Sequence, residues 1–86
     1  MTALFHREFK KSFKRLRPGE QARVNERLAI FVQDPFDFTL NNHALHGVYA
    51  GSRSINISGD LRAVYKLISS DVAHFIALGT HSRLYL

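Results

Sequence analysis

The chain has 86 residues, of which 45% are hydrophobic and 12% aromatic, and its formal net charge is +5. This length suits one domain over residues 1–86, and the apolar content argues against a disordered chain. The absence of cysteine excludes disulfides, thiolate nucleophiles and sulfur-bound zinc, and the lack of a long apolar segment favours a cytoplasmic protein with no membrane partner.

The first half of the chain has the apolar spacing of two helices. An amphipathic helix is predicted over residues 7–16, and Pro18-Gly19 interrupts it. A second helix ends before Pro35, because the residue ahead of a proline disfavours helical conformation. The run Met1 to Phe5 could add a short strand, but it also fits a helical start. The apolar residues expected in the core are Phe9, Phe13 and Leu16 from the first helix and Val24, Leu28, Phe31 and Val32 from the second.

Positive charge is concentrated around the first of these helices. Its basic residues are opposed only by Glu8, and the rest of the chain balances to zero. Such a patch fits a partner rich in phosphate or carboxylate, although a solvated helix face that maintains solubility would look the same. The basic residues are Arg7, Lys10, Lys11, Lys14, Arg15 and Arg17.

The second half of the chain has the pattern of a sheet. Runs rich in β-branched and aromatic residues are predicted as strands over 53–58, 61–68 and 72–78, joined by a Gly59-Asp60 turn and by "SSD". Consecutive strands with such short connections form an antiparallel meander. The predicted fold class is therefore α+β, with an N-terminal helical hairpin packed on one face of a three- to four-stranded antiparallel sheet.

The composition also limits the chemistry. The seven acidic residues include no closely spaced pair, which disfavours a two-metal nuclease. His43 and His46 form an H-x-x-H pair, but a third ligand and a helical context are missing, so no metal and no cofactor are expected. Phosphate loops, nucleophile elbows and dinucleotide fingerprints are absent from the sequence. Histidine and arginine remain as the candidate reactive groups.

Two stretches carry a family resemblance. "NHALHGVYAGSRSINISGDLRAVYK" and "LGTHSRLY" resemble the C-terminal half of the YafQ-like branch of the RelE/ParE toxin superfamily. The resemblance implies a toxin of a type II toxin-antitoxin system that cleaves mRNA on the ribosome without a metal. It implies a cognate antitoxin as partner, through which the complex could bind operator DNA. RNA supplies its own nucleophile, the 2′-hydroxyl, so imidazole and guanidinium groups suffice for such a reaction.

The same resemblance assigns roles to five residues. His81, after Gly79-Thr80, is the leading general acid or base, and His43 is the second candidate, against a plain loop role. Arg62 corresponds to a strand arginine that neutralises the scissile phosphate, and strand alternation places it opposite Leu61 and Ala63. Asp60 could orient an imidazole or simply form the turn. Tyr85 could stack on a base or pack at the edge.

Other positions are expected to bind RNA or differ from the family pattern. Three residues differ from those usual in the family: Asn56, Leu61 and Ala77. An alternative is therefore a ParE-like toxin that binds DNA gyrase without cutting RNA. A plain nucleic-acid-binding domain is a third reading, with no base-reading motif to support it. His6 and His74 are interpreted as structural or surface residues. The residues expected to contact RNA or the ribosome are Lys10, Lys11, Lys14, Arg15, Arg53 and Lys66.

Overall fold

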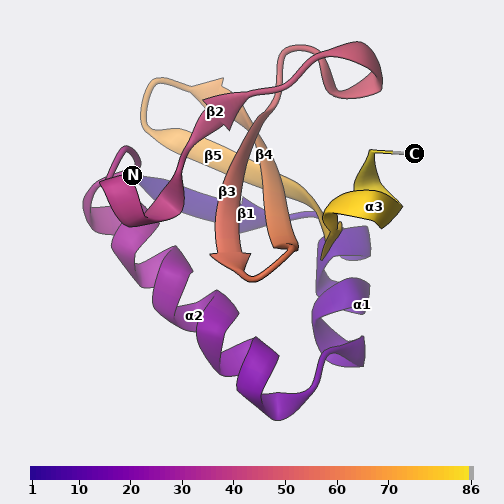
Figure 1. Ribbon diagram of the computed structural model, residues 1–86. Coiled ribbons are helices and arrows are strands. Elements are labelled where there is room, and N and C mark those ends of the chain that lie inside the picture. Colours follow the sequence, from indigo (N-terminus) through magenta and orange to yellow (C-terminus); the bar gives the residue numbers. More distant parts are fainter. Residues whose placement is uncertain (86) are drawn as a thin grey trace.

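The computed structural model describes residues 1–85 as an α+β fold, with two long helices on one face of a sheet (Figure 1). The elements in chain order are β1 (Thr2–Phe5), α1 (Arg7–Arg15), α2 (Pro18–Gln33), the 3₁₀ turn η1 (Phe38–Leu40), β2 (His43–Ala44), the 3₁₀ turn η2 (Gly47–Tyr49), β3 (Arg53–Ser58), β4 (Leu61–Ser69), β5 (Val72–Thr80) and α3 (His81–Leu84).

The sheet has five strands in the order β1-β5-β4-β3-β2 and is mixed. β1 runs parallel to β5, with Phe5 opposite Phe75, and the other neighbours are antiparallel. The predicted α+β class and helical hairpin are confirmed, but the prediction of a purely antiparallel sheet of three or four strands is wrong. The prediction lacked the parallel pair because β1 pairs with β5, which lies near the other end of the chain. It lacked β2 because that strand is too short to show an alternating pattern.

Both long helices begin and end where local chemistry favours it. The ring of His6 accepts a hydrogen bond from the backbone N–H of Glu8 (3.0 Å) and caps α1, which ends in basic residues that suit the helix dipole. Pro18 opens α2, and the carboxylate of Glu20 accepts from the backbone N–H of Arg17 (3.1 Å). The predicted end before Pro35 is confirmed. No helix within residues 1–85 has the length and apolarity needed to cross a bilayer.

The core lies between the two helices and the sheet. Phe31 of α2 packs edge-on against Tyr65 and Phe75, with ring centroids 4.8 and 5.1 Å away. Phe9 of α1 reaches the same Phe75 ring at 5.7 Å. Burying each such side chain contributes roughly 1.5–3 kcal/mol, so these aromatics fix how the hairpin sits on the sheet. Val32 was predicted to share this face but is 38% exposed, because it is one residue from Phe31 and points about 100° away around the helix.

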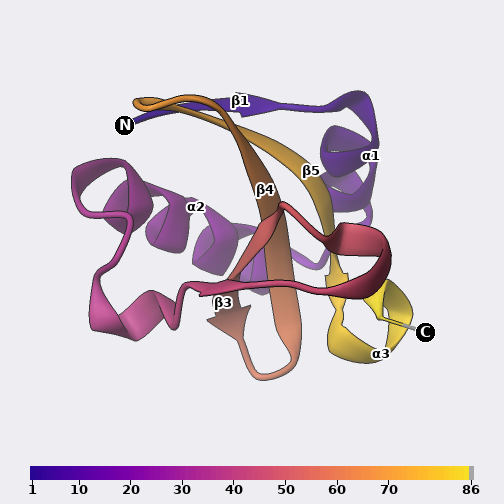
Figure 2. The same ribbon diagram turned by 90° about the horizontal axis from the view of Figure 1, so that it is seen from above.

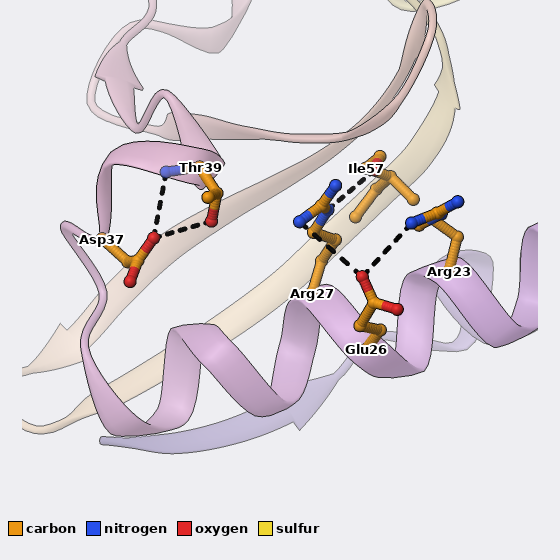
Figure 3. A network of polar contacts seen from close by, with 6 residues as sticks. All are labelled: Arg23, Glu26, Arg27, Asp37, Thr39 and Ile57. Atoms are coloured by element: carbon orange, nitrogen blue, oxygen red, sulfur yellow. Dashed lines mark hydrogen bonds and ion pairs between the residues drawn. The ribbon is translucent and has the colours of Figure 1, made fainter.

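A polar network at the outer side of α2 reinforces its position (Figure 3). The Nε of Arg27 donates to the backbone carbonyl of Ile57 in β3 (3.0 Å), which ties the helix to the sheet. Glu26 forms ion pairs with the exposed Arg23 (3.3 Å) and the half-buried Arg27 (3.7 Å). An exposed pair such as Arg23–Glu26 contributes little to stability.

The turn that follows α2 is stabilised by Asp37. Its carboxylate accepts hydrogen bonds from the hydroxyl (2.7 Å) and the backbone N–H (3.0 Å) of Thr39. These two bonds favour the ionised form and lower the pKa of Asp37 below its ordinary value. The aspartate therefore caps η1 while it remains charged.

Strands β3, β4 and β5 form the predicted meander. Leu61, Ala63 and Tyr65 of β4 are buried in the core beneath the helices, so Arg62 and Val64 lie on the opposite face, as alternation predicts. β5 was expected to stop at a glycine turn after Leu78. It continues through Gly79 to Thr80 and passes directly into α3 (Figure 2).

Candidate active site

The sheet face that the helices leave open carries most of the residues selected from the sequence. Residues directly opposite each other in neighbouring strands point to the same face. One row across this face comprises His43, Ser54, Val64 and Ala77. The next row comprises Asn56, Arg62 and Gly79. Strand pairing therefore brings His43 and Arg62 to one surface, although their positions in the sequence are well separated.

The short helix α3 closes one end of this face. Its first backbone N–H, from His81, donates to the carbonyl oxygen of Asp60 in the β3–β4 turn (2.8 Å). The hydroxyl of Thr80 caps the helix by accepting from the N–H of Arg83 (3.3 Å). A β-carbon at Gly79 would lie 3.4 Å from the side chain of Leu84, at ordinary van der Waals distance, so α3 lies directly against this end of β5. These contacts fix His81 beside the turn that carries Asp60.

Tyr85 connects α3 to the open face. Its hydroxyl donates to the Oγ of Ser54 (3.1 Å), and Ser54 is fully buried. Its ring lies 4.7 Å from the ring of His81 and 5.9 Å from the ring of Tyr49, in both cases close to perpendicular. His81, Tyr85 and Tyr49 thus form a row of three rings, which we call the aromatic row. It runs from α3 to η2, and the two segments flank this end of the sheet (Figure 2).

Tyr49 is the member of the aromatic row that the sequence did not single out. It lies in "GVYAG", a stretch to which no element or role is assigned from the sequence. The available signal was an aromatic residue between glycines in a stretch otherwise matched to the toxin family. Without the fold, nothing in the sequence placed it next to Tyr85.

Arg62 is held at the β3–β4 turn. Its Nη1 donates to the carbonyl oxygens of Gly59 (2.8 Å) and Leu61 (3.1 Å). Within residues 1–85, Nε and Nη2 form no hydrogen bond, so these donors remain available to an anion. Asn56 lies opposite Arg62 in the neighbouring strand β3. Its Oδ1 is buried and has no hydrogen-bond partner within residues 1–85.

His43 is exposed and its ring has a defined orientation. Nδ1 lies 2.8 Å from the carbonyl oxygen of Asn41, which adopts a left-handed conformation (φ 45°). A carbonyl oxygen only accepts, so Nδ1 must carry the proton of this bond. In the neutral ring, Nε2 then keeps its lone pair and can accept a proton.

Asp60 is exposed in the turn, and its contact with His81 is made by the backbone. Among residues 1–85, its carboxylate makes no hydrogen bond to an imidazole. Within the same range, no three histidine, aspartate or glutamate side chains lie together where they could hold a metal ion.

The residues expected to contact RNA or the ribosome fall into separate places. Those on α1, and Lys66 of β4, are exposed, and Lys66 shares the open face with its partner His74. Arg53 differs, because its Nε donates to Asn42 (2.7 Å) and its guanidinium lies 5.2 Å from the ring centroid of Phe36. Arg53 pairs across the strands with the core residue Tyr65 and is therefore separated from the open face. The exposed residues on α1 are Lys10, Lys11, Lys14 and Arg15.

A hollow of about 350 Å³ lies between α1 and α3, beside the core residues Leu61 and Leu78. Arg15 lines it from α1, and Arg83 and Leu84 line it from α3. Glu20 of α2 also lines this hollow, so charges of both signs lie around it.

Residues 1–86, the whole chain, match a family model described as the bacterial toxin of type II toxin-antitoxin system, YafQ. The chain belongs to the YafQ toxin family. The resemblance to the RelE/ParE superfamily is thereby confirmed, and the match does not favour the ParE-like alternative. No curated protein matches the toxin's sequence.

Solved structures support the fold. YafQ from Escherichia coli strain BL21(DE3) is 19% identical, with 98% of this toxin and 97% of that chain covered and a TM-score of 0.78. A chain of the E. coli DinJ-YafQ toxin-antitoxin complex is 18% identical, with 98% and 96% covered and a TM-score of 0.78. A chain of the Staphylococcus aureus YoeB-YefM complex is 15% identical, with 94% and 97% covered and a TM-score of 0.75.

Proposed function

We propose that this toxin is a metal-independent endoribonuclease that cleaves mRNA on the ribosome. The observation that carries the proposal is the gathering of two imidazoles, one guanidinium and one phenol around a single open sheet face. His43 and Arg62 reach that face by strand pairing, and Tyr85 is fixed to it by its bond to Ser54. Family membership supports the same conclusion.

The reaction requires a proton to leave the 2′-hydroxyl as its oxygen attacks the adjacent phosphorus. His43 suits this step, because the bond from its Nδ1 to Asn41 leaves Nε2 free to accept the proton. The phosphorus–5′-oxygen bond then breaks, and the departing oxygen takes a proton from His81 in its imidazolium form. The products are a 2′,3′-cyclic phosphate and a 5′-hydroxyl, so neither water nor metal enters this step.

Arg62 supplies electrostatic stabilisation. Negative charge grows on the phosphate oxygens in the transition state, and the Nε and Nη2 donors of a guanidinium match two such oxygens. The Nη1 bonds to Gly59 and Leu61 fix the group before substrate arrives. Asp60 is proposed to act chiefly through its backbone carbonyl, which positions His81.

The exposed lysines of α1 are proposed to bind ribosomal or messenger phosphates. Within residues 1–85, the ion pairs involve only Arg23, Glu26 and Arg27, so the α1 charges are not neutralised inside the described chain. A second proposed partner is a cognate antitoxin of complementary acidic character, through which the complex would bind operator DNA. Action on ribosomes places the toxin in the cytoplasm.

The test is primer extension on a translated message in the presence of EDTA. Wild-type toxin should cut, and His81→Ala and Arg62→Ala should each lower the rate by roughly 10²–10⁴-fold. Arg23→Ala is the matched control, because Arg23 lies on α2 in an exposed ion pair away from the open face. Cutting retained by the His81 variant would contradict its role. No cutting by wild type, with gyrase inhibited instead, would assign the toxin to the ParE-like class.

A further inference from the structure

We infer that Tyr49 is a base-stacking residue that, together with Tyr85, selects the nucleotide next to the scissile phosphate. This inference rests on the proposed ribonuclease function. It adds a specificity-determining residue that the sequence analysis did not assign.

The loop that carries Tyr49 has a fixed conformation. Gly47 and Gly51 adopt left-handed backbone angles (φ 66° and 89°), which side chains other than glycine tolerate poorly. The N–H of Ala50 donates to the carbonyl of Gly47 (3.0 Å), and the N–H of Ser52 donates to the carbonyl of Tyr49 (2.9 Å). The ring therefore projects from a closed turn that is anchored at the start of β3.

The aromatic row places the Tyr49 ring one ring away from His81. Tyr85 lies between them, and the interplanar angle of the two tyrosines is 90°. Two rings at a right angle form a corner. A flat base stacked on one ring would meet the other ring with its edge. Such a corner beside the candidate acid–base group would hold one nucleotide in a defined orientation.

Tyr49 has little structural purpose apart from this contact. It is only half-buried and does not belong to the hydrophobic core cluster, and its neighbour Val48 is 92% exposed. Within residues 1–85, its hydroxyl makes no hydrogen bond. An aromatic face held at the rim of a site, outside the core, suits stacking on a nucleobase, because every base has a π-face.

The test measures binding of a short oligoribonucleotide that is 2′-O-methylated throughout and therefore cannot be cut. Fluorescence anisotropy would compare wild type with Tyr49→Leu and Tyr49→Phe. Leu fills space without a π-face and should weaken binding by roughly 5- to 100-fold, whereas Phe should stay within about twofold. Phe38→Leu is the matched control, because Phe38 is 90% exposed in η1 and lies outside the site. Thermal melting would check that every variant is folded.

Abasic substitutions, introduced one position at a time, separate stacking from a general effect on the surface. If Tyr49 stacks on a particular base, removing that base should weaken wild type and abolish the difference between wild type and Tyr49→Leu. On a translated message, Tyr49→Leu should raise KM with little change in kcat and should redistribute the cut sites.

The outcomes distinguish this inference from the proposed function. Wild-type affinity in Tyr49→Leu, or a loss that persists at every abasic position, would overturn the role of Tyr49 alone. A base-specific loss without any cutting by wild type would support stacking and overturn the nuclease. Failure of wild type to bind or cut RNA would overturn both.

Discussion

The hydrogen bond between Tyr85 and Ser54 is expected to stabilise the fold in a way that a double-mutant cycle can measure. Tyr85→Phe leaves the fully buried hydroxyl of Ser54 without a partner, and this should lower the free energy of unfolding by about 1–3 kcal/mol. Ser54→Ala should cost less, about 0.5–1.5 kcal/mol, because the half-buried phenol can turn to water. The double variant removes both polar groups and should lose no more than Ser54→Ala alone.

The assay is urea denaturation of wild type, the two single variants and the double variant. Tyr49→Phe serves as the control, because it removes a phenol that makes no hydrogen bond within residues 1–85 and should change the free energy of unfolding by less than about 0.5 kcal/mol. Losses that simply add, within about 0.5 kcal/mol, would show that the two hydroxyls are not coupled. The proposed anchoring of α3 to the open face would then be refuted.

Three further predictions concern the surface and the loops. Replacing Lys10 and Lys14 with Gln should reduce the slope of log affinity for ribosomes against log salt by roughly one to two, and an unchanged slope would assign these charges to solubility. Gly51→Ala should lower the free energy of unfolding by about 1–2 kcal/mol because of its left-handed backbone (φ 89°), and an undiminished urea midpoint would contradict this. The two bonds from Thr39 lower the folded-state pKa of Asp37, so its contribution is present above the ordinary value of 3.8 and is lost as the pH falls through the folded pKa. Asp37→Asn should therefore flatten the pH dependence of stability below about 3.8, and an unchanged acid profile would reject this role.

The helical hairpin and the central meander could be predicted from the sequence because local signals determine them. Proline at 18 and 35 bounds α2, and the spacing of Phe9 and Phe13 identifies the buried side of α1. β1 could not be assigned, because four residues of apolar sequence fit either conformation and the parallel partner lies far along the chain. The prediction ends β5 at Leu78 because glycine often marks a turn, whereas Gly79 pairs with Arg62 and the strand continues to Thr80.

Candidate site residues could be named from the sequence, but only part of their arrangement could be predicted. Alternation correctly placed Arg62 on the face opposite Leu61, because a strand has a strict period of two. The same rule places Arg53 on the side of the buried Ile55, although its contacts with Asn42 and Phe36 arise only in the tertiary fold. The contact between Tyr49 and Tyr85 likewise could not be predicted from the sequence, because the two residues are far apart along the chain.

The central claim, that the toxin uses the substrate's own 2′-hydroxyl, can be tested with one modified nucleotide. A ribosome-bound message would carry a single 2′-deoxynucleotide immediately 5′ of the main cleavage site, and cutting would be followed in EDTA. We expect cutting to disappear at that site alone and to persist at other sites in the same message. Undiminished cutting at the deoxynucleotide would contradict the account, because the attacking oxygen would then have to come from elsewhere.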